Sequence, residues 1–243
     1  MTERVFEQDG YAKLCDAMVV QRDGNDVILD RTVFYPLGGG QPGDRGEFVL
    51  ADGTRFAVVE TVKGDGGAIV HRIQGDASAL EPGVRVTAAI DWPRRYAHMR
   101  YHTCLHLLCA VVAAPVTGGR MGEDKAHLDF DIEMDKLDAS DIEARLNVLI
   151  ARDDAVEPGE IHEAELDANP GLVKTMSVQP PRGQGTVRTI RIADIDLQPC
   201  GGTHLLRTSE IGRVRVSKIR SEGKRNKRVT IVLEAPDQAV GMQ

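Results

Sequence analysis

The chain has 243 residues, of which 42% are hydrophobic and 28% are charged, and its formal net charge is −7 at pH 7. This composition is ordinary for a soluble globular protein and excludes a disordered chain, which has fewer apolar residues. No run approaches the roughly 18 consecutive apolar residues of a membrane span, and the N-terminus lacks the pattern of a secretion signal. Four cysteines do not make a disulfide scaffold. We therefore expect a cytoplasmic protein of one or two domains, a monomer by default, with no membrane partner.

The chain up to about residue 91 has the pattern of β-structure. Short apolar runs are separated by turn signals such as Asp23-Gly24-Asn25 and Asp52-Gly53, where glycine accepts the positive φ of tight hairpins. The runs lie at residues 19–20, 27–29, 48–50, 56–59, 68–73 and 84–90. Short strands at this spacing predict a small barrel or sandwich.

A helix is predicted over residues 94–114, because Asp91 can cap it, Pro93 suits its first turn and Pro115 ends it. The patterns that follow predict a strand within 118–132, a helix over 141–152, a strand at 161–166, a short helix at 169–176, a strand at 187–192, a loop at 198–203 and a strand pair over 212–233. We place the domain boundary near residue 92. The expected fold class is therefore α+β, with a β-domain over residues 1–92 and a second domain over residues 93–243.

Two pairs of potential metal ligands share a spacing of four residues. His102 and His106 lie one turn apart on one face of the predicted helix, and Cys200 and His204 lie in a loop. Each pair alone is a weak signal, since a helix often carries two ordinary polar histidines. Together they offer the nitrogen and sulfur ligands that zinc prefers. We therefore predict one zinc ion per chain, bound to these four residues.

Neighbouring residues add detail to this predicted site. Gly201 and Gly202 are expected to let the backbone bend so that the cysteine and the histidine of the loop converge. His98 is a hydrogen-bond partner of a ligand, a competing ligand or an ordinary polar residue. The sequence leaves open whether the zinc has four protein ligands or keeps one position for water or substrate. Three other cysteines are expected to be buried as small apolar residues: Cys15, Cys104 and Cys109.

The same stretches resemble a known family. Residues 102–108 (HTCLHLL) and 200–204 (CGGTH) are similar to the paired motifs of the editing domain of alanyl-tRNA synthetase, and residues 119–131 resemble the strand region after the first motif. Residues 34–36 and the Gly-rich segment 38–46 (GGGQPGDRG) resemble the region upstream of that domain. Because the resemblance covers nearly the whole chain in order, the chain is identified as similar to free-standing alanyl-tRNA editing proteins of the AlaX family, in their form with an N-terminal β-barrel.

The resemblance implies a two-layer α/β editing domain of the threonyl/alanyl-tRNA synthetase type after the barrel. It also implies hydrolysis of the ester between a wrong amino acid, serine or glycine, and the 3′ end of tRNA(Ala). Nothing resembles the ATP-dependent synthetase domain, so no ATP site is expected. The four predicted ligands would then be catalytic, with zinc either supplying hydroxide from bound water or only orienting the substrate. The expected substrate-binding residues are Thr103, Leu105, Gly40, Gln41, Asp44, Gly201, Gly202 and Thr203.

Leu105 departs from the family's pattern. The family commonly has threonine just before the second histidine, and the resemblance places that hydroxyl against the serine side chain. A site that hydrogen-bonds a hydroxyl discriminates by about 10⁴-fold, whereas an apolar pocket achieves about 10²-fold. We therefore expect weak selectivity for serine, or a different amino acid such as alanine, unless Thr103 or Thr117 supplies another hydroxyl.

The negative net charge by itself disfavours a nucleic-acid partner, but residues 213–228 carry eight basic residues and one acidic residue. The alternation Arg213-Val214-Arg215-Val216 places basic side chains on one strand face, and residues 224–228 are predicted to form a charged hairpin tip. Such a strand pair is either a solvated surface or a phosphate-binding surface, and the one-sided charge favours phosphates. The predicted tRNA-binding residues are Arg213, Arg215, Lys218, Arg220, Lys224, Arg225, Lys227 and Arg228.

Three functions remain open at the level of the sequence. The first is a zinc-dependent aminoacyl-tRNA deacylase that edits tRNA in trans. The second is a non-catalytic, zinc-stabilised tRNA-binding module, which differs from the first in having no free position on the zinc. The third is a zinc hydrolase for another small ester or amide, which the basic strand pair disfavours because a small substrate needs no such surface.

Overall fold

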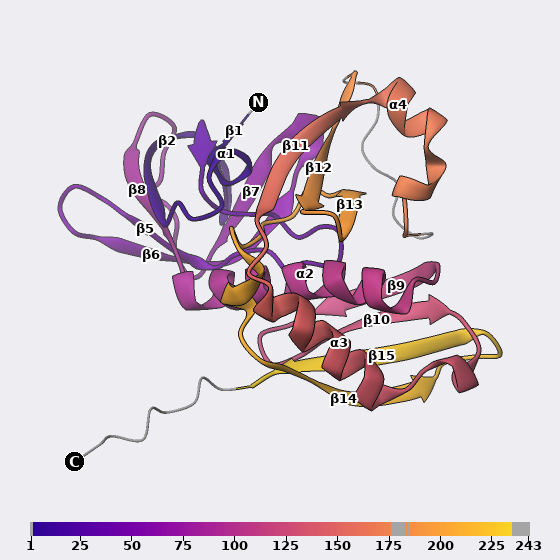
Figure 1. The fold of residues 1–243 in the computed structure, drawn as a ribbon. Coiled ribbons are helices and arrows are strands. Elements are labelled where there is room, and N and C mark those ends of the chain that lie inside the picture. Colours follow the sequence, from indigo (N-terminus) through magenta and orange to yellow (C-terminus); the bar gives the residue numbers. More distant parts are fainter. Residues whose placement is uncertain (1, 176–182, 184, 235–243) are drawn as a thin grey trace, which may run out of the picture. The chain divides into compact units, whose positions relative to one another are not determined.

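The computed structural model of the chain describes residues 2–175, 183 and 185–234 (Figure 1). The chain divides into two compact units, residues 1–99 and 100–243. The long helix α2 (Trp92–Val112) begins in the first unit and continues into the second, and it matches the helix predicted over residues 94–114. None of the helices in the described part of the chain has both the length and the apolar content needed to span a membrane.

The first unit is a closed barrel, which confirms the predicted N-terminal β-barrel. Its six strands follow one another around the barrel in the order β2 (Leu14–Asp23), β3 (Asp26–Leu29), β7 (Ile69–Ile73), β6 (Arg55–Lys63), β5 (Gly46–Val49) and β8 (Arg85–Ile90). Apolar side chains alternate inward along the strands, and the closed sheet leaves no free edge. Three short elements were not predicted: β1 (Glu3–Arg4), which pairs with β4 (Arg31–Thr32), and the helical turn α1 (Val5–Gln8). A 3₁₀ turn, η1 (Asp65–Gly67), precedes β7.

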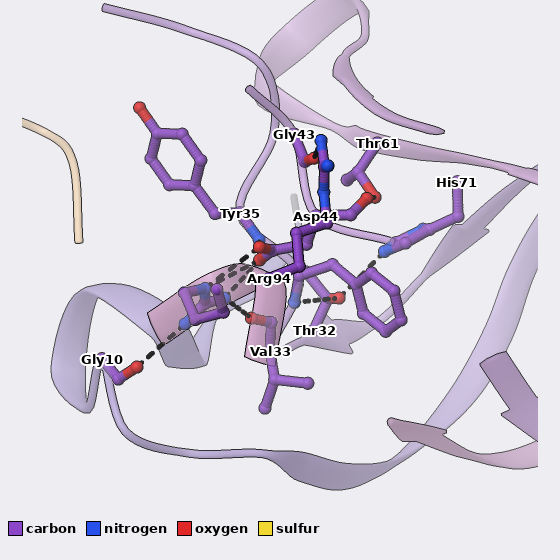
Figure 2. Close-up of polar contacts among 11 residues, drawn as sticks. Gly10, Thr32, Val33, Tyr35, Gly43, Asp44, Thr61, His71 and Arg94 are labelled. Carbon is purple, nitrogen blue, oxygen red and sulfur yellow. Dashed lines mark hydrogen bonds and ion pairs between the residues drawn. The ribbon is translucent and has the colours of Figure 1, made fainter. Parts of the chain in front are cut away.

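A buried ion pair anchors the Gly-rich segment within this unit (Figure 2). The carboxylate of Asp44 accepts hydrogen bonds from Arg95 Nε at 3.0 and 3.1 Å and from the Tyr35 backbone N–H at 2.6 Å. Arg95 also donates to the carbonyls of Gly10 at 2.9 Å and Val33 at 2.6 Å. Both charged side chains are buried. Because breaking a buried pair costs about 3–5 kcal/mol, this contact holds the segment in one conformation.

Glycine is required at specific points of that segment. Gly39 and Gly40 have φ values of 58° and 81°. The flanking residues, Gly38 and Gln41, exchange two backbone hydrogen bonds of 3.1 and 3.0 Å. Two consecutive positive φ values define a type I′ turn, which disfavours residues with a side chain. At Gly43 a Cβ atom would lie 2.2 Å from the carbonyl oxygen of Thr61, so the barrel wall leaves room only for glycine.

The second unit contains two antiparallel sheets (Figure 1). The four-stranded sheet has the order β14 (Val214–Ser221), β15 (Asn226–Leu233), β10 (Ala126–Asp131) and β9 (Val116–Met121). The three-stranded sheet has the order β11 (Val156–His162), β12 (Thr186–Ile192) and β13 (Asp196–Pro199). Helix α3 (Ala139–Ala151) packs along β14, where Asn147 donates to the Val214 carbonyl at 2.8 Å. The predicted helix over 141–152, strand at 187–192 and strand pair over 212–233 are thereby confirmed.

Several predicted elements of this unit were wrong in detail. The strand predicted within 118–132 is a hairpin of two strands, β9 and β10. The strand predicted at 161–166 is the end of β11 followed by helix α4 (Glu163–Ala168). Pro158 and Gly159 are unfavourable in most strands, so the sequence pattern did not indicate β11. Both are tolerated here because β11 is an edge strand.

The remaining differences concern short segments. The helix predicted over 169–176 is only the 3₁₀ turn η3 (Pro170–Leu172), and residue 176 lies outside the described residues. The predicted loop at 198–203 begins inside β13, and the predicted hairpin tip at 224–228 lies partly on β15. Two further 3₁₀ turns, η2 (Met134–Lys136) and η4 (Thr208–Ile211), complete the unit.

Candidate metal centre

The four predicted ligands converge in the second unit. His102 and His106 extend from α2, and Cys200 and His204 extend from the segment between β13 and η4. Their potential ligand atoms all lie within 4.8 Å of one another. The ring centroids of His102 and His106 lie 4.2 and 4.7 Å from that of His204. A helix and a loop about 100 residues apart therefore build one cluster.

The geometry of the cluster suits a tetrahedral zinc ion. Cys200 Sγ lies 3.5 Å from His102 Nε2 and 3.3 Å from His204 Nε2. Nitrogen at about 2.1 Å and sulfur at about 2.3 Å from a tetrahedral zinc lie roughly 3.6 Å from each other. Histidine nitrogen and cysteine sulfur are also both ligand types that zinc takes. The residues present therefore fit the predicted metal.

The electrostatics of the cluster favour its metal-binding forms at two positions. Burial would raise the pKa of Cys200, but the neighbouring imidazoles of His102 and His204 hold it well below its usual value, so the thiolate is available to a metal. Burial lowers the pKa of His204 to about 3, which keeps its imidazole neutral. Burial also lowers the pKa of His106, but its hydrogen bonds to Asp196 and Cys200 outweigh burial and raise it to about 9.

A carboxylate that the sequence analysis missed lies against the cluster. Asp196 Oδ2 accepts hydrogen bonds from His106 Nδ1 at 2.9 Å and from Gln198 Nε2 at 2.8 Å, and Oδ1 forms an ion pair with Lys174. The side chain of Asp196 is fully buried. One signal was available in the sequence, because residues 196, 198 and 200 alternate at the end of a strand and therefore share a face.

Two hydroxyl groups considered as partners of a substrate serine are already engaged. Thr103 Oγ1 lies 3.2 Å from His204 Nδ1 and accepts a hydrogen bond from the Leu205 backbone N–H at 3.2 Å. Thr117 Oγ1 donates to the Asn226 side-chain oxygen at 2.7 Å. Both hydroxyls therefore have partners within the protein.

The loop that contains Gly201 and Gly202 does not use the left-handed backbone conformation that favours glycine, because neither residue has a positive φ. Instead Arg188 Nη1 donates to the carbonyls of Cys200 at 2.7 Å and Gly202 at 3.0 Å and thereby holds the loop. A Cβ atom at Gly201 would meet no heavy atom within 4 Å, so open space lies beside this residue.

The other predicted residues divide between the two units. The first unit contains Gly40 together with the buried residues Gln41 and Asp44. The second unit contains Leu105 and Thr203, which are both buried. Their roles toward a substrate stay predictions. Cysteines outside the cluster are buried as predicted, and burial raises the pKa values of two of them, Cys104 and Cys109, to about 12. His98 is also buried.

Much of the basic block on β14 and β15 is neutralised by carboxylates. Four arginines form ion pairs: Arg213 with Glu234 at 3.2 Å, Arg225 with Asp131 at 2.6 Å, Arg228 with Asp129 at 2.7 Å, and Arg220 with Glu222. Lys227 is buried, and its Nζ donates to oxygens of its own hairpin at 2.7, 2.8 and 3.1 Å. Within the described part of the chain, the exposed basic side chains of the block that form no ion pair are Arg215, Lys218 and Lys224.

Comparisons with known proteins agree with this arrangement. A family model described as tRNA synthetases class II (A) matches residues 9–94, and one described as the threonyl and alanyl tRNA synthetase second additional domain matches residues 187–230. The chain is 34% identical over 226 residues to an alanine–tRNA ligase of Metallosphaera sedula, matching 90% of this chain and 24% of the ligase. The shared region is therefore only a part of the ligase.

Two free-standing relatives match along nearly their whole length. The chain is 36% identical over 233 residues to the alanyl-tRNA editing protein AlaX-M of Saccharolobus solfataricus, covering 94% of this chain and 98% of that protein. It is also 36% identical over 242 residues to the AlaX-M protein of Methanosarcina barkeri, covering 96% and 99%. With both its barrel and its His–Cys cluster inside these matches, the chain belongs to the AlaX family of alanyl-tRNA editing proteins.

Proposed function

We propose that the chain is a trans-acting aminoacyl-tRNA deacylase that hydrolyses mischarged tRNA(Ala) with the help of zinc. The amino acid removed is serine or glycine, with alanine as a third candidate. The observation that carries the proposal is the convergence of one cysteine and three histidines, whose ligand atoms lie within 4.8 Å of one another, in a chain whose relatives are named alanyl-tRNA editing proteins. The names of the relatives supply the substrate class, and the cluster supplies the means of catalysis.

The side chains that would hold the zinc are His102, His106, Cys200 and His204. When bound, zinc supplies either a lowered pKa for a coordinated water or a positive charge that orients the substrate. Hydrolysis adds water to the ester carbonyl, breaks the bond to the ribose oxygen and returns a proton to that oxygen. An aminoacyl ester is already labile, so a rigid site contributes mainly by orientation. Helix α2 and the bonds from Arg188 to the loop provide that rigidity.

One observation favours a second function. Four protein donors converge, and a zinc ion that binds all four at once has no free position for water or substrate. The chain would then be a non-catalytic, zinc-stabilised tRNA-binding module. The two proposals differ in whether one of the four protein ligands leaves the zinc, so that water or substrate can bind in its place.

Deacylation of a panel of charged tRNAs separates these functions. We expect hydrolysis of Ser-, Gly- or Ala-tRNA(Ala) that stops when a chelator is added, and that stops in Cys200→Ala while the circular dichroism spectrum is retained. The matched control is Cys104→Ala, which changes a buried cysteine outside the cluster and should keep the rate. Absence of hydrolysis across the whole panel with zinc present would contradict the deacylase. Loss of folded structure in Cys200→Ala would favour the binding module.

The same panel tests selectivity. Leu105 is apolar, and the hydroxyls of Thr103 and Thr117 are engaged within the protein, which supports a site without a free hydroxyl for serine. We therefore expect a preference for Ser-tRNA(Ala) over Ala-tRNA(Ala) of no more than about 10²-fold, and a larger preference in Leu105→Thr. A wild-type preference of about 10⁴-fold would contradict this expectation.

We also propose that the exposed part of the basic block contacts the phosphates of tRNA. A register shift between Val216 and Lys218 on β14 places Arg215 and Lys218 on the same exposed face, although three residues apart they would face opposite ways on a regular strand. Lys224 lies in the turn that follows β14. These three are the exposed cations of the block that form no ion pair within the described residues.

A further inference from the structure

We propose that Asp196 is a positioning residue of the metal centre, which orients His106 so that its Nε2 atom faces the other ligands. This inference rests on the metal centre of the proposed function. It adds a residue that neither the spacing of the ligands nor the motifs of the sequence assign.

The hydrogen bond between the two side chains defines the tautomer of His106. His106 Nδ1 lies 2.9 Å from Asp196 Oδ2. An ionised carboxylate only accepts hydrogen bonds, so Nδ1 carries the hydrogen and the lone pair of the neutral imidazole is on Nε2. A metal binds that lone pair. Of the two neutral tautomers of His106, the contact therefore favours the one that can act as a ligand through Nε2.

A second histidine of the cluster is held in the same way. His204 Nδ1 lies 3.2 Å from Thr103 Oγ1, and its Nε2 lies 3.3 Å from Cys200 Sγ. In both histidines a protein oxygen binds Nδ1, which leaves Nε2 for the shared centre. The contact between His106 and Asp196 is therefore one of two contacts of the same kind in this cluster.

Asp196 is itself fixed in position by two further donors. Gln198 Nε2 donates to the same Oδ2 atom at 2.8 Å, and the ammonium of Lys174 pairs with Oδ1. The carboxylate is fully buried, whereas Lys174 is partly exposed. A buried carboxylate without partners would be strongly unfavourable. These contacts therefore stabilise the ionised form of Asp196 and restrict the rotation of its carboxylate.

The position of Asp196 in the fold links the two halves of the cluster. Asp196 lies at the start of β13, where it pairs with Ile192 of β12, and the same strand leads to Cys200. Its side chain reaches His106 on α2. One strand therefore sets the loop ligands directly and one helical ligand through a hydrogen bond.

The experiment compares the zinc affinity of the full-length wild type with that of Asp196→Asn and a matched control, by competition with a chelator. The control is Asp194→Asn, which alters an exposed carboxylate (78% accessible) that pairs with Arg152 at 2.7 Å. We expect Asp196→Asn to bind zinc about 10–100-fold more weakly, because partners of this kind contribute that much to affinity. Asp194→Asn should bind zinc like the wild type. Equal affinities of Asp196→Asn and the wild type would overturn the inference.

A measurement on the wild type keeps the inference testable if Asp196→Asn does not fold. In zinc-loaded protein labelled with ¹⁵N-histidine, nuclear magnetic resonance should show a protonated Nδ1 and a zinc-bound Nε2 for His106. Zinc on Nδ1 of His106 would overturn the inference, as would a wild type that binds no zinc. Failure of the proposed function is seen separately, as absence of deacylation by a chain that binds zinc as described.

Discussion

His71 is a buried titratable residue in the barrel. Its ring packs edge-on against those of Phe34 and Phe48, at centroid distances of 5.3 and 5.2 Å. Nδ1 donates to the Val27 carbonyl at 3.1 Å, and Nε2 accepts from the Thr32 hydroxyl at 2.9 Å. Figure 2 shows His71 and Thr32 joined in this way. Burial lowers the pKa of His71 to about 4, so the folded barrel holds the neutral ring.

This lowered pKa predicts a loss of stability in mild acid. The pKa of an unfolded histidine is about 6.5. Between pH 6.5 and about 4 the unfolded chain therefore binds the proton that the folded chain excludes, and stability falls as the pH falls. We expect His71 to account for a loss of about 2 kcal/mol between pH 7.5 and pH 5.0. Urea unfolding followed by the fluorescence of Trp92, the single tryptophan and part of the first unit, measures it.

The control for this prediction is His71→Gln, which keeps a neutral amide able to donate and accept. Its free energy of unfolding should be lower than that of the wild type at neutral pH but should change less between the two pH values. Identical pH dependence in the two proteins would rule out His71 as the origin of the acid sensitivity.

At the scale of elements, the strand pair β14–β15 shows that charge in sequence differs from charge available to a partner. Arg213 and Arg225 are both basic and both paired with carboxylates. Arg215 and Lys218 form no ion pair within the part of the chain that the structure describes. Exposed cations without an internal partner are the ones that release counterions from a nucleic acid when they bind it.

This difference predicts which substitutions weaken tRNA binding. The double variant Arg215→Ala/Lys218→Ala should bind tRNA(Ala) more weakly and lower the slope of log affinity against log salt by about 2, about 1 for each lost phosphate contact. The double variant Arg213→Ala/Arg225→Ala has the same change in net charge but removes arginines that already have partners, so its slope should stay close to that of the wild type. Binding titrations at several salt concentrations measure both, and equal slopes for the two variants would contradict the assignment.

At the scale of the whole molecule, the four candidate metal ligands all belong to one of the two units. The barrel has its own core and its own buried ion pair, whereas the residues of the proposed metal centre lie within residues 100–243. A ligand that binds only the folded state stabilises the unit that contains its site. The effect of zinc is therefore expected to be local to the second unit.

Removal of zinc should accordingly destabilise one unit. At zinc concentrations of about 100 times the dissociation constant, bound metal adds about 2.7 kcal/mol to the stability of its unit. After chelation we expect faster amide hydrogen exchange in α3 and β10–β15, and unchanged exchange in β2–β8. Hydrogen exchange read by mass spectrometry, with and without the chelator, measures both. Equal changes in the two units would show that zinc does not act through the second unit alone.

The sequence alone predicted the parts that depend on local pattern. Alternation and glycine turns revealed most barrel strands, and an uninterrupted segment between Pro93 and Pro115 revealed α2. The sequence pointed to His102 and His106 as candidate ligands because they lie one helical turn apart, and this spacing can be read from neighbouring residues. Cys200 and His204 were predicted from their residue types and because they lie four residues apart, as His102 and His106 do.

Only the tertiary structure decided the contacts between distant residues. Asp196 lies 90 residues from His106 in sequence, and no periodicity connects them. Asp131 neutralises Arg225 across a separation of 94 residues, so the basic block looked more available in sequence than it is in the fold. The physical reason is the same in each case: propensity and periodicity report the neighbours along the chain, whereas hydrogen-bond and ion-pair partners depend on which strands and helices pack together.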